Sequence, residues 1–206
     1  MSANKMKTKF MGKGVKMAIR KQPTTFAKAA EARKKVYDEA VNYYKSSSFQ
    51  WSKYPRNSSS STIGKTKSAV YAFFVKNPNE HVEKILTAVS AKKEESKNNK
   101  LPKVNADYKE SFKKNGCLYI GSVTSETLES RIKQHWRLER DGDKGNGTYA
   151  LKIKDWIGST NLNVDDITVY YCNMTGQKVE LIRILEDCLA AMYCPLLGKR
   201  GDSPKG

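Results

Sequence analysis

The sequence has few of the residue patterns that build metal or disulfide frameworks. Its 206 residues include four cysteines and two histidines. No two cysteines form a CxxC pair, and neither histidine lies at a zinc-finger spacing from them, so we expect no structural zinc site. Nothing in the sequence indicates an oxidising compartment, and we therefore expect buried free thiols rather than disulfides.

Long apolar runs are also missing. No stretch approaches the roughly 18 consecutive apolar residues that a membrane-spanning helix needs, so we expect no membrane partner. The N-terminus is basic, but the apolar stretch that follows it, residues 14–19, is short and contains a lysine. This excludes the apolar region of a secretory signal, and we predict a cytoplasmic protein.

Acidic residues are scarce relative to basic ones. The chain has 38 Lys and Arg against 21 Asp and Glu, which gives a net charge of +17. Residues 1–67 hold 16 of the basic residues and only 3 acidic ones, a net +13. Because neutralising phosphates releases condensed counterions, such clustered charge favours a nucleic-acid partner over a merely solvated surface. A basic ribosome-associated or RNA-binding protein is one alternative within this class.

The apolar residues present are enough for a packed core, since they make up 38% of the chain. Short β-rich runs predict three buried strands, over residues 69–75, 117–123 and 167–173. Apolar residues at helical spacing predict four helices, from Thr24 or Thr25 to Lys45, over 80–93, from Thr124 or Ser125 to Glu139, and over 178–192. Between the second helix and the second strand, residues 94–106 are charged and Asn-rich, which predicts an exposed loop.

Helices and strands alternate along the chain, which predicts an α+β fold of layered α/β type. We expect a small three-stranded central sheet flanked by helices, with a basic helical N-terminal extension. Residues 1–67 are expected to form that extension, beginning with a flexible arm and ending in a Ser-rich connector. Residues 68–206 are expected to form the main domain, with an insertion at about 76–116.

The run CLYIGSVTSETLESRIKQH, residues 117–135, contains the residues best suited to chemistry. A predicted strand carries Tyr119-Ile120-Gly121, and a helix follows it. Arg131 and His135 are four residues apart and so share one face of that helix. Far downstream, Glu186 lies among apolar residues of the last helix, where a charge is costly unless it is paired or bound to a cation.

This ordered set resembles the GIY-YIG nuclease family over about residues 69–197. The second half of the motif is literal in Tyr119-Ile120-Gly121. The Arg and the His of the family fall on Arg131 and His135, and its metal-binding Glu falls on Glu186, a few residues before Pro195. The family often has an Asn after that proline, which this chain lacks.

The first half of the motif departs further from the family pattern. Its best candidate is Ala69-Val70-Tyr71, where Ala replaces the usual Gly, at the start of a β-rich run. Tyr71 and Tyr119 are separated by more residues than the usual hairpin contains, which requires an insertion between them. Tyr108 is the alternative first tyrosine, in a polar context that does not favour a strand.

The resemblance implies a metal-dependent phosphodiesterase with no small-molecule cofactor. Glu186 would bind one Mg²⁺, with Mn²⁺ as an alternative metal. Arg131 would hold a non-bridging phosphate oxygen. Tyr71 would act as the general base, its pKa lowered by nearby cations, and Tyr119 and His135 would orient water or relay a proton.

The resemblance also implies double-stranded DNA as the substrate. Residues near the motif are the candidates for contacting it: Lys133, Trp136, Arg137, Lys199 and Arg200. A compact nuclease domain with a basic extension is similar to the restriction-enzyme branch, so we expect a sequence-specific endonuclease that works as a homodimer or higher homo-oligomer. The alternatives are a repair or mobile-element nuclease and a catalytically inactive nucleic-acid-binding protein.

Overall fold

The structure is a computed structural model of the chain, and it describes residues 23–55, 63, 65–95, 101–136 and 150–198. The expected N-terminal arm lies outside the described residues, as do Arg137, Lys199 and Arg200. The mixed helix-and-strand class expected from the sequence is confirmed.

One antiparallel sheet forms the centre of the fold, with the strand order β1-β4-β2-β3. The strands are β1 Ser52–Lys53, β2 Ala69–Val75, β3 Cys117–Val123 and β4 Ile167–Asn173. The three longer strands have the bounds that their apolar runs predicted. β2 and β3 are apolar on both faces because helices or loops cover both sides of the sheet there.

The prediction of three strands was wrong, because β1 adds a fourth at the edge of the sheet. β1 comes from the Ser-rich connector and pairs with Tyr170 and Tyr171 of β4. Next to it, the Tyr54 N–H donates to the Val169 carbonyl, and the Tyr54 ring packs edge-on against Tyr171. Two exposed residues have no apolar alternation to signal a strand, so only the open edge of β4 explains this pairing.

Five α-helices are described, one more than expected. They are α1 Pro23–Lys45, α2 Pro78–Glu95, α3 Lys109–Asn115, α4 Leu128–Trp136 and α5 Val179–Tyr193. The additional helix, α3, has seven residues and a single fully buried side chain, Phe112, which is too short a pattern for periodicity to reveal. α3 ends at Gly116, whose φ of +68° is the left-handed conformation that favours glycine.

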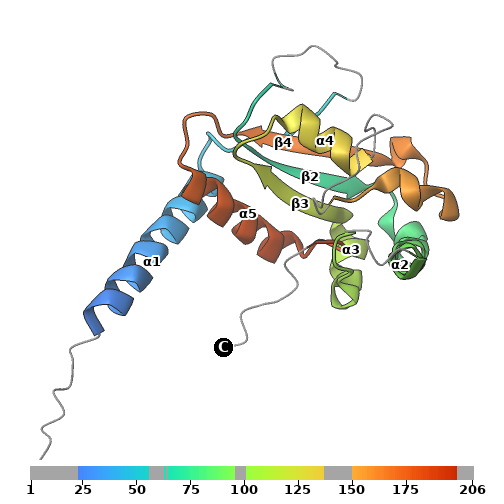
Figure 1. Cartoon of the computed structure of the whole chain (residues 1–206), viewed down its shortest axis with the longest axis horizontal. Helices are drawn as coiled ribbons and strands as arrows, with labels where there is room; N and C mark the ends of the chain where they lie inside the picture. The colour runs from blue at the N-terminus through green and yellow to red at the C-terminus, as the bar shows by residue number, and fades with distance from the viewer. Residues whose placement is uncertain (1–22, 56–62, 64, 96–100, 137–149, 199–206) are drawn as a thin grey trace, which may run out of the picture.

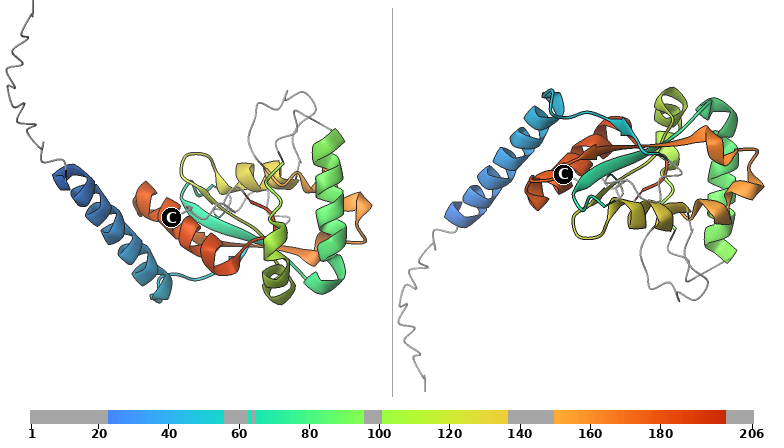
Figure 2. Two further views of the ribbon diagram at one scale, coloured as in Figure 1. Left: turned by 90° about the horizontal axis from the view of Figure 1, so that it is seen from below. Right: turned by 90° about the horizontal axis from the view of Figure 1, so that it is seen from above.

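The helices cover the two faces of the sheet with separate apolar cores. On one face, Tyr71 and Phe73 of β2 pack with side chains of α2, α3 and α4. On the other face, Val70 and Ala72 pack with α5 and with Ala40 of α1. Figure 1 shows α1 alongside α5, and Figure 2 shows its N-terminal end reaching away from the rest of the protein. None of the described helices has the length and hydrophobicity needed to cross a bilayer.

Residues 101–105 are not the exposed loop that their surroundings predicted. Leu101 is 2% exposed and Asn105 is 6% exposed. The Asn105 backbone N–H donates to the Leu196 carbonyl, and its side-chain amide donates to the Pro195 carbonyl. The Leu196 N–H in turn donates to the Cys117 carbonyl of β3. These bonds fasten the chain after α5 to the start of β3.

Candidate active site

The register of β2 on β3 brings the two motif tyrosines together. Tyr71 lies opposite Gly121, and Phe73 lies opposite Tyr119. Tyr71 and Tyr119 therefore share one face of the sheet, with ring centroids 6.3 Å apart and ring planes 28° apart. Of the two candidate first tyrosines, Tyr71 lies in this cluster, whereas Tyr108 lies in the short helical turn before α3.

Gly121 leaves the space that the Tyr71 ring occupies. A Cβ at position 121 would lie 2.5 Å from the Tyr71 hydroxyl oxygen and 2.9 Å from Cε1 of Tyr119. Both distances are far below a van der Waals contact. The glycine of the YIG tripeptide is therefore required here by the close approach of a side chain.

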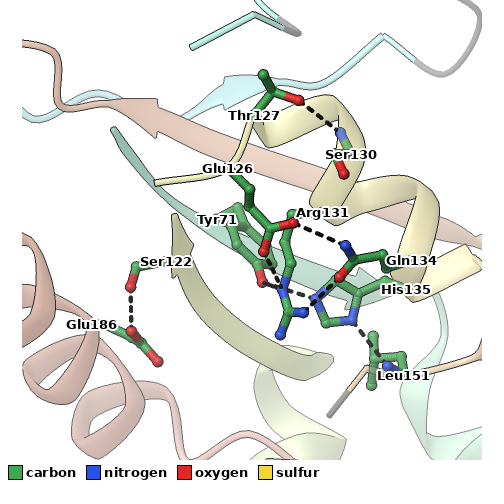
Figure 3. A network of polar contacts seen from close by, with 10 residues as sticks. All are labelled: Tyr71, Ser122, Glu126, Thr127, Ser130, Arg131, Gln134, His135, Leu151 and Glu186. Atoms are coloured by element: carbon green, nitrogen blue, oxygen red, sulfur yellow. Dashed lines mark hydrogen bonds and ion pairs between the residues drawn. The ribbon is translucent and has the colours of Figure 1, made fainter. Parts of the chain in front are cut away.

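Helix α4 places Arg131 and His135 on the same side, as their spacing predicted. The helix starts one turn before Arg131, where the Thr127 hydroxyl accepts the Ser130 N–H, so the cap is Thr127 and the expected cap at Thr124 or Ser125 was wrong. Arg131 Nε donates to the Tyr71 oxygen at 3.1 Å. His135 Nε2 lies 2.8 Å from the same oxygen (Figure 3).

Two side chains that the sequence did not single out hold the Arg131 guanidinium. Its Nη1 donates to Gln134 Oε1 at 2.8 Å, and its Nε lies 3.9 Å from the Glu126 carboxylate. Gln134 Nε2 donates to Glu126 Oε2 at 2.9 Å, which closes the network shown in Figure 3. The Arg131 side chain is only 11% exposed, so these contacts restrict its position strongly.

His135 has no exposed surface, and both of its ring nitrogens have partners. Besides the Tyr71 contact at Nε2, its Nδ1 accepts the backbone N–H of Leu151 at 3.0 Å. Its ring also lies 4.7 Å from the Tyr119 ring, measured between centroids. Leu151 follows a stretch outside the described residues, and no sequence pattern indicated this contact.

Burial dominates the electrostatics of this cluster. Burial raises the pKa of Tyr71 well above its ordinary value, and the neighbouring Tyr119 adds to the rise while Arg131 opposes it. The expectation that nearby cations lower the pKa of Tyr71 was therefore wrong for the protein without substrate or metal. Burial likewise raises the pKa of Tyr119, again against the effect of Arg131. For His135, burial and then Arg131 lower the pKa well below its ordinary value, so the ring is neutral near pH 7.

Glu186 lies apart from the tyrosine cluster, on α5, and is half-buried. Its Oε2 accepts a hydrogen bond from the Ser122 hydroxyl of β3. No ion pair between described residues involves Glu186, and so none joins it to Arg183, three residues earlier in α5. Its charge nevertheless acts on both tyrosines, because it raises the pKa of Tyr71 and of Tyr119.

The environment of Glu186 fits a cation with few protein ligands. A half-buried carboxylate with one hydroxyl partner keeps oxygen lone pairs for a metal, and oxygen is the ligand type that Mg²⁺ prefers. Mg²⁺ commonly binds through one or two carboxylates and keeps several waters. Among the described residues, no group of three or more His, Cys, Asp or Glu could hold a metal ion. The donor set thus suits a sparsely liganded Mg²⁺ on Glu186.

The five candidate nucleic-acid contacts differ in where they lie. Lys133 is exposed on the outer side of α4, where it pairs with Glu129 at 2.6 Å. Trp136 is 7% exposed and packs against Phe73 in the core, so the expectation that it contacts DNA was wrong. Trp136 follows His135 directly in α4 and lies on the side of that helix that packs against the sheet. The other three candidates lie outside the described residues.

Comparison with known proteins found no relative of this chain. No protein-family model matches the chain, and neither the curated proteins nor the solved structures include a match.

Proposed function

We propose that this chain is a Mg²⁺-dependent endonuclease of the GIY-YIG type, which hydrolyses phosphodiester bonds in double-stranded DNA. The proposal includes sequence-specific cleavage of the restriction type, by a homodimer or higher homo-oligomer. Mn²⁺ is expected to replace Mg²⁺, since both are bound by oxygen ligands. The resemblance of the motif residues supplies the family, and the geometry of the site supports it.

One observation carries the proposal: residues from three separate elements meet at a single phenol oxygen. The oxygen of Tyr71, on β2, lies within hydrogen-bond distance of Arg131 and His135 of α4. Gly121 of β3 leaves space for the Tyr71 ring. Burying this many polar groups costs free energy unless they satisfy one another. These residues also follow one another along the sequence in the order of the family motif.

The roles follow from the chemistry of each group. In its ionised form, Tyr71 takes a proton from water, and the water oxygen forms a bond to phosphorus while the bond to the leaving oxygen breaks. The leaving oxygen then takes a proton from solvent. Arg131 neutralises a non-bridging oxygen of the phosphate, where negative charge increases in the transition state. Mg²⁺ bound at Glu186 would supply Lewis-acid stabilisation of the phosphate and of the leaving oxygen.

The reaction requires a small rearrangement around Tyr71. Its side chain has no exposed surface, so a water cannot reach its oxygen in the arrangement seen here. Arg131 is the partner of Tyr71 with surface exposed, whereas His135 has none. A bound phosphate would attract the guanidinium outward, which would uncover the Tyr71 oxygen. The bound metal would favour the ionised phenol by adding positive charge nearby, which would offset the negative charge of the phosphate.

The charge of the chain supports a polyanionic substrate. The net charge is +17, and exposed basic residues on the described part of α1 include Lys28, Arg33 and Lys34. Because α1 packs on α5 through its C-terminal half, its N-terminal half stays available for nucleic acid. Binding through phosphates weakens steeply as salt increases.

The first test is cleavage of plasmid DNA by the wild type and by Glu186→Gln, with Mg²⁺ or with EDTA. Gln has nearly the same shape and keeps an oxygen for Ser122, but it lacks the charge that a metal needs. Glu180→Gln is the matched control, because Glu180 is exposed in the first turn of the same helix. We expect discrete fragments from the wild type and the control with Mg²⁺, and at least about a 100-fold loss in Glu186→Gln.

Other outcomes of the same experiment separate the alternatives. Salt-sensitive DNA binding without cleavage in any variant would overturn the enzyme proposal and leave an inactive nucleic-acid-binding protein. Mg²⁺-dependent cleavage that gives no discrete fragments would favour a repair or mobile-element nuclease. Cleavage that persists in Glu186→Gln would show that the metal is held elsewhere.

A further inference from the structure

The two nitrogens of His135 differ in what they can do, because their partners differ. At Nδ1 the partner is the backbone N–H of Leu151, at 3.0 Å. At Nε2 the partner is the hydroxyl oxygen of Tyr71, at 2.8 Å. A backbone N–H can only donate a hydrogen bond, whereas a hydroxyl can donate or accept one.

The Leu151 contact determines where the proton of the ring lies. Since the N–H donates to Nδ1, that nitrogen offers its lone pair and carries no proton. A neutral imidazole has one N–H, which must then be on Nε2. The ring is neutral near pH 7 because burial lowers the pKa of His135, as does the charge of Arg131. The hydrogen bond between His135 and Tyr71 therefore runs from Nε2–H to the phenol oxygen.

The Tyr71 oxygen consequently accepts two hydrogen bonds. One comes from Nε2–H of His135, and the other from Nε–H of Arg131 at 3.1 Å. Two donors on one oxygen stabilise the phenolate over the phenol, which is the form that a general base needs. Burial opposes ionisation, so these donors work against the largest effect on the pKa of Tyr71.

We propose that His135 is a fixed hydrogen-bond donor to Tyr71, with its tautomer set by the Leu151 backbone, and that it takes no proton during the reaction. This assigns His135 a positioning role and decides between the two roles that the sequence left open. When Arg131 moves toward a bound phosphate, His135 remains as the donor that holds the Tyr71 oxygen in place. The catalytic part rests on the proposed function, but the tautomer does not.

The tautomer is measured directly by nitrogen NMR on protein with ¹⁵N-labelled histidine, without DNA or metal. The chain has two histidines, so the His81→Gln variant, which keeps His135, assigns the signal. We expect a neutral His135 ring near pH 7 with its proton on Nε2, and an Nδ1 shift typical of a hydrogen-bonded acceptor nitrogen. A proton on Nδ1, or a charged ring, would overturn the proposal whether or not the protein cleaves DNA.

The role in the reaction is tested with three substitutions, His135→Gln, His135→Asn and His135→Ala. The amide nitrogen of Gln reaches about as far as Nε2 and donates, but it does not accept a proton at neutral pH. The amide of Asn is shorter and does not reach the Tyr71 oxygen. For a fixed donor, we expect Gln to keep cleavage within about tenfold of the wild type, and Asn and Ala to lose about 100-fold in kcat.

The opposite pattern would show proton transfer through His135. If Gln loses as much as Asn and Ala while all three variants keep a cooperative thermal transition, His135 must accept or relay a proton. Unfolding of a variant is recognised from that transition, and the NMR measurement on the wild type then decides. Absence of cleavage in the wild type would reject the proposed function and leave the tautomer measurement intact.

Discussion

The two faces of β3 carry two unlike halves of the candidate site. Gly121 faces the cluster of Tyr71, Arg131 and His135, whereas the next residue, Ser122, bonds Glu186 of α5 on the other side. The first half is buried, and each group in it has protein partners. The second half is a half-buried carboxylate with one hydroxyl partner. The polar groups of the first half satisfy one another, whereas the carboxylate of the second half has one hydrogen bond among the described residues.

This difference predicts that substitutions in the first half reduce the free energy of unfolding more than substitutions in the second half. Groups that satisfy one another in a dry interior become costly when one partner is removed, because the remaining partner stays buried and unpaired. Glu186 has no ion pair among the described residues, and its neutralisation would leave only the Ser122 hydroxyl with a changed partner. Substitutions should therefore separate loss of activity from loss of stability.

The largest contrast is expected between Tyr71→Phe and Glu186→Gln. Both should abolish cleavage, and Tyr71→Phe should lose about 1000-fold because the general base is gone. Only Tyr71→Phe should also reduce the free energy of unfolding, by about 1–3 kcal/mol, since it leaves the donors of Arg131 and His135 without their acceptor. Urea denaturation of both variants measures this, and equal stability losses would contradict the comparison.

The next largest effect is expected for Gly121→Ala. The added methyl group would overlap the Tyr71 hydroxyl, so we expect a loss of about 1–3 kcal/mol in the free energy of unfolding, with a loss of cleavage. Gly158→Ala is the matched control, because no atom lies within 4 Å of a Cβ at that position. A stable and fully active Gly121→Ala variant would refute the close approach of Tyr71.

Acid should weaken the buried half through His135. The unfolded chain binds a proton at this residue near pH 6.5, but burial holds the pKa of the folded ring well below that value. The stabilisation is therefore fully present above pH 6.5 and decreases as the pH falls below it, by at most about 1.4 kcal/mol per pH unit. Denaturation at a series of pH values should show this slope in the wild type, and His135→Gln should lack it.

The smallest effect is expected for Ser122, which donates a hydrogen bond to the proposed metal ligand Glu186. Ser122→Ala removes the hydrogen bond to Glu186, so we expect Mg²⁺ or Mn²⁺ affinity to fall by about tenfold, with little change in stability. Ser122→Thr keeps the hydroxyl and serves as the control. Titration calorimetry with Mn²⁺ measures both, and equal affinities in all three proteins would show that Ser122 does not orient the carboxylate.

The sequence was sufficient for features that arise within one element. Apolar runs located β2, β3 and β4 with their bounds, because burial on both faces leaves an uninterrupted apolar pattern. The helical period placed Arg131 and His135 on one face, and both do contact Tyr71. The order of the motif residues along the chain also indicated Tyr71 and Glu186 as candidates, and both lie in apolar stretches of the sequence.

Features that join distant parts of the chain could not be read in this way. The strand β1 forms only because β4 leaves an edge open, and Trp136 turns inward because α4 packs on the sheet. The sign of the shift in the pKa of Tyr71 depends on its complete burial, which outweighs the charge of Arg131. The proton of His135 is located by Leu151, which is 16 residues away in the sequence. Composition and spacing can indicate candidate groups for the chemistry, but desolvation and hydrogen-bond direction depend on the folded surroundings.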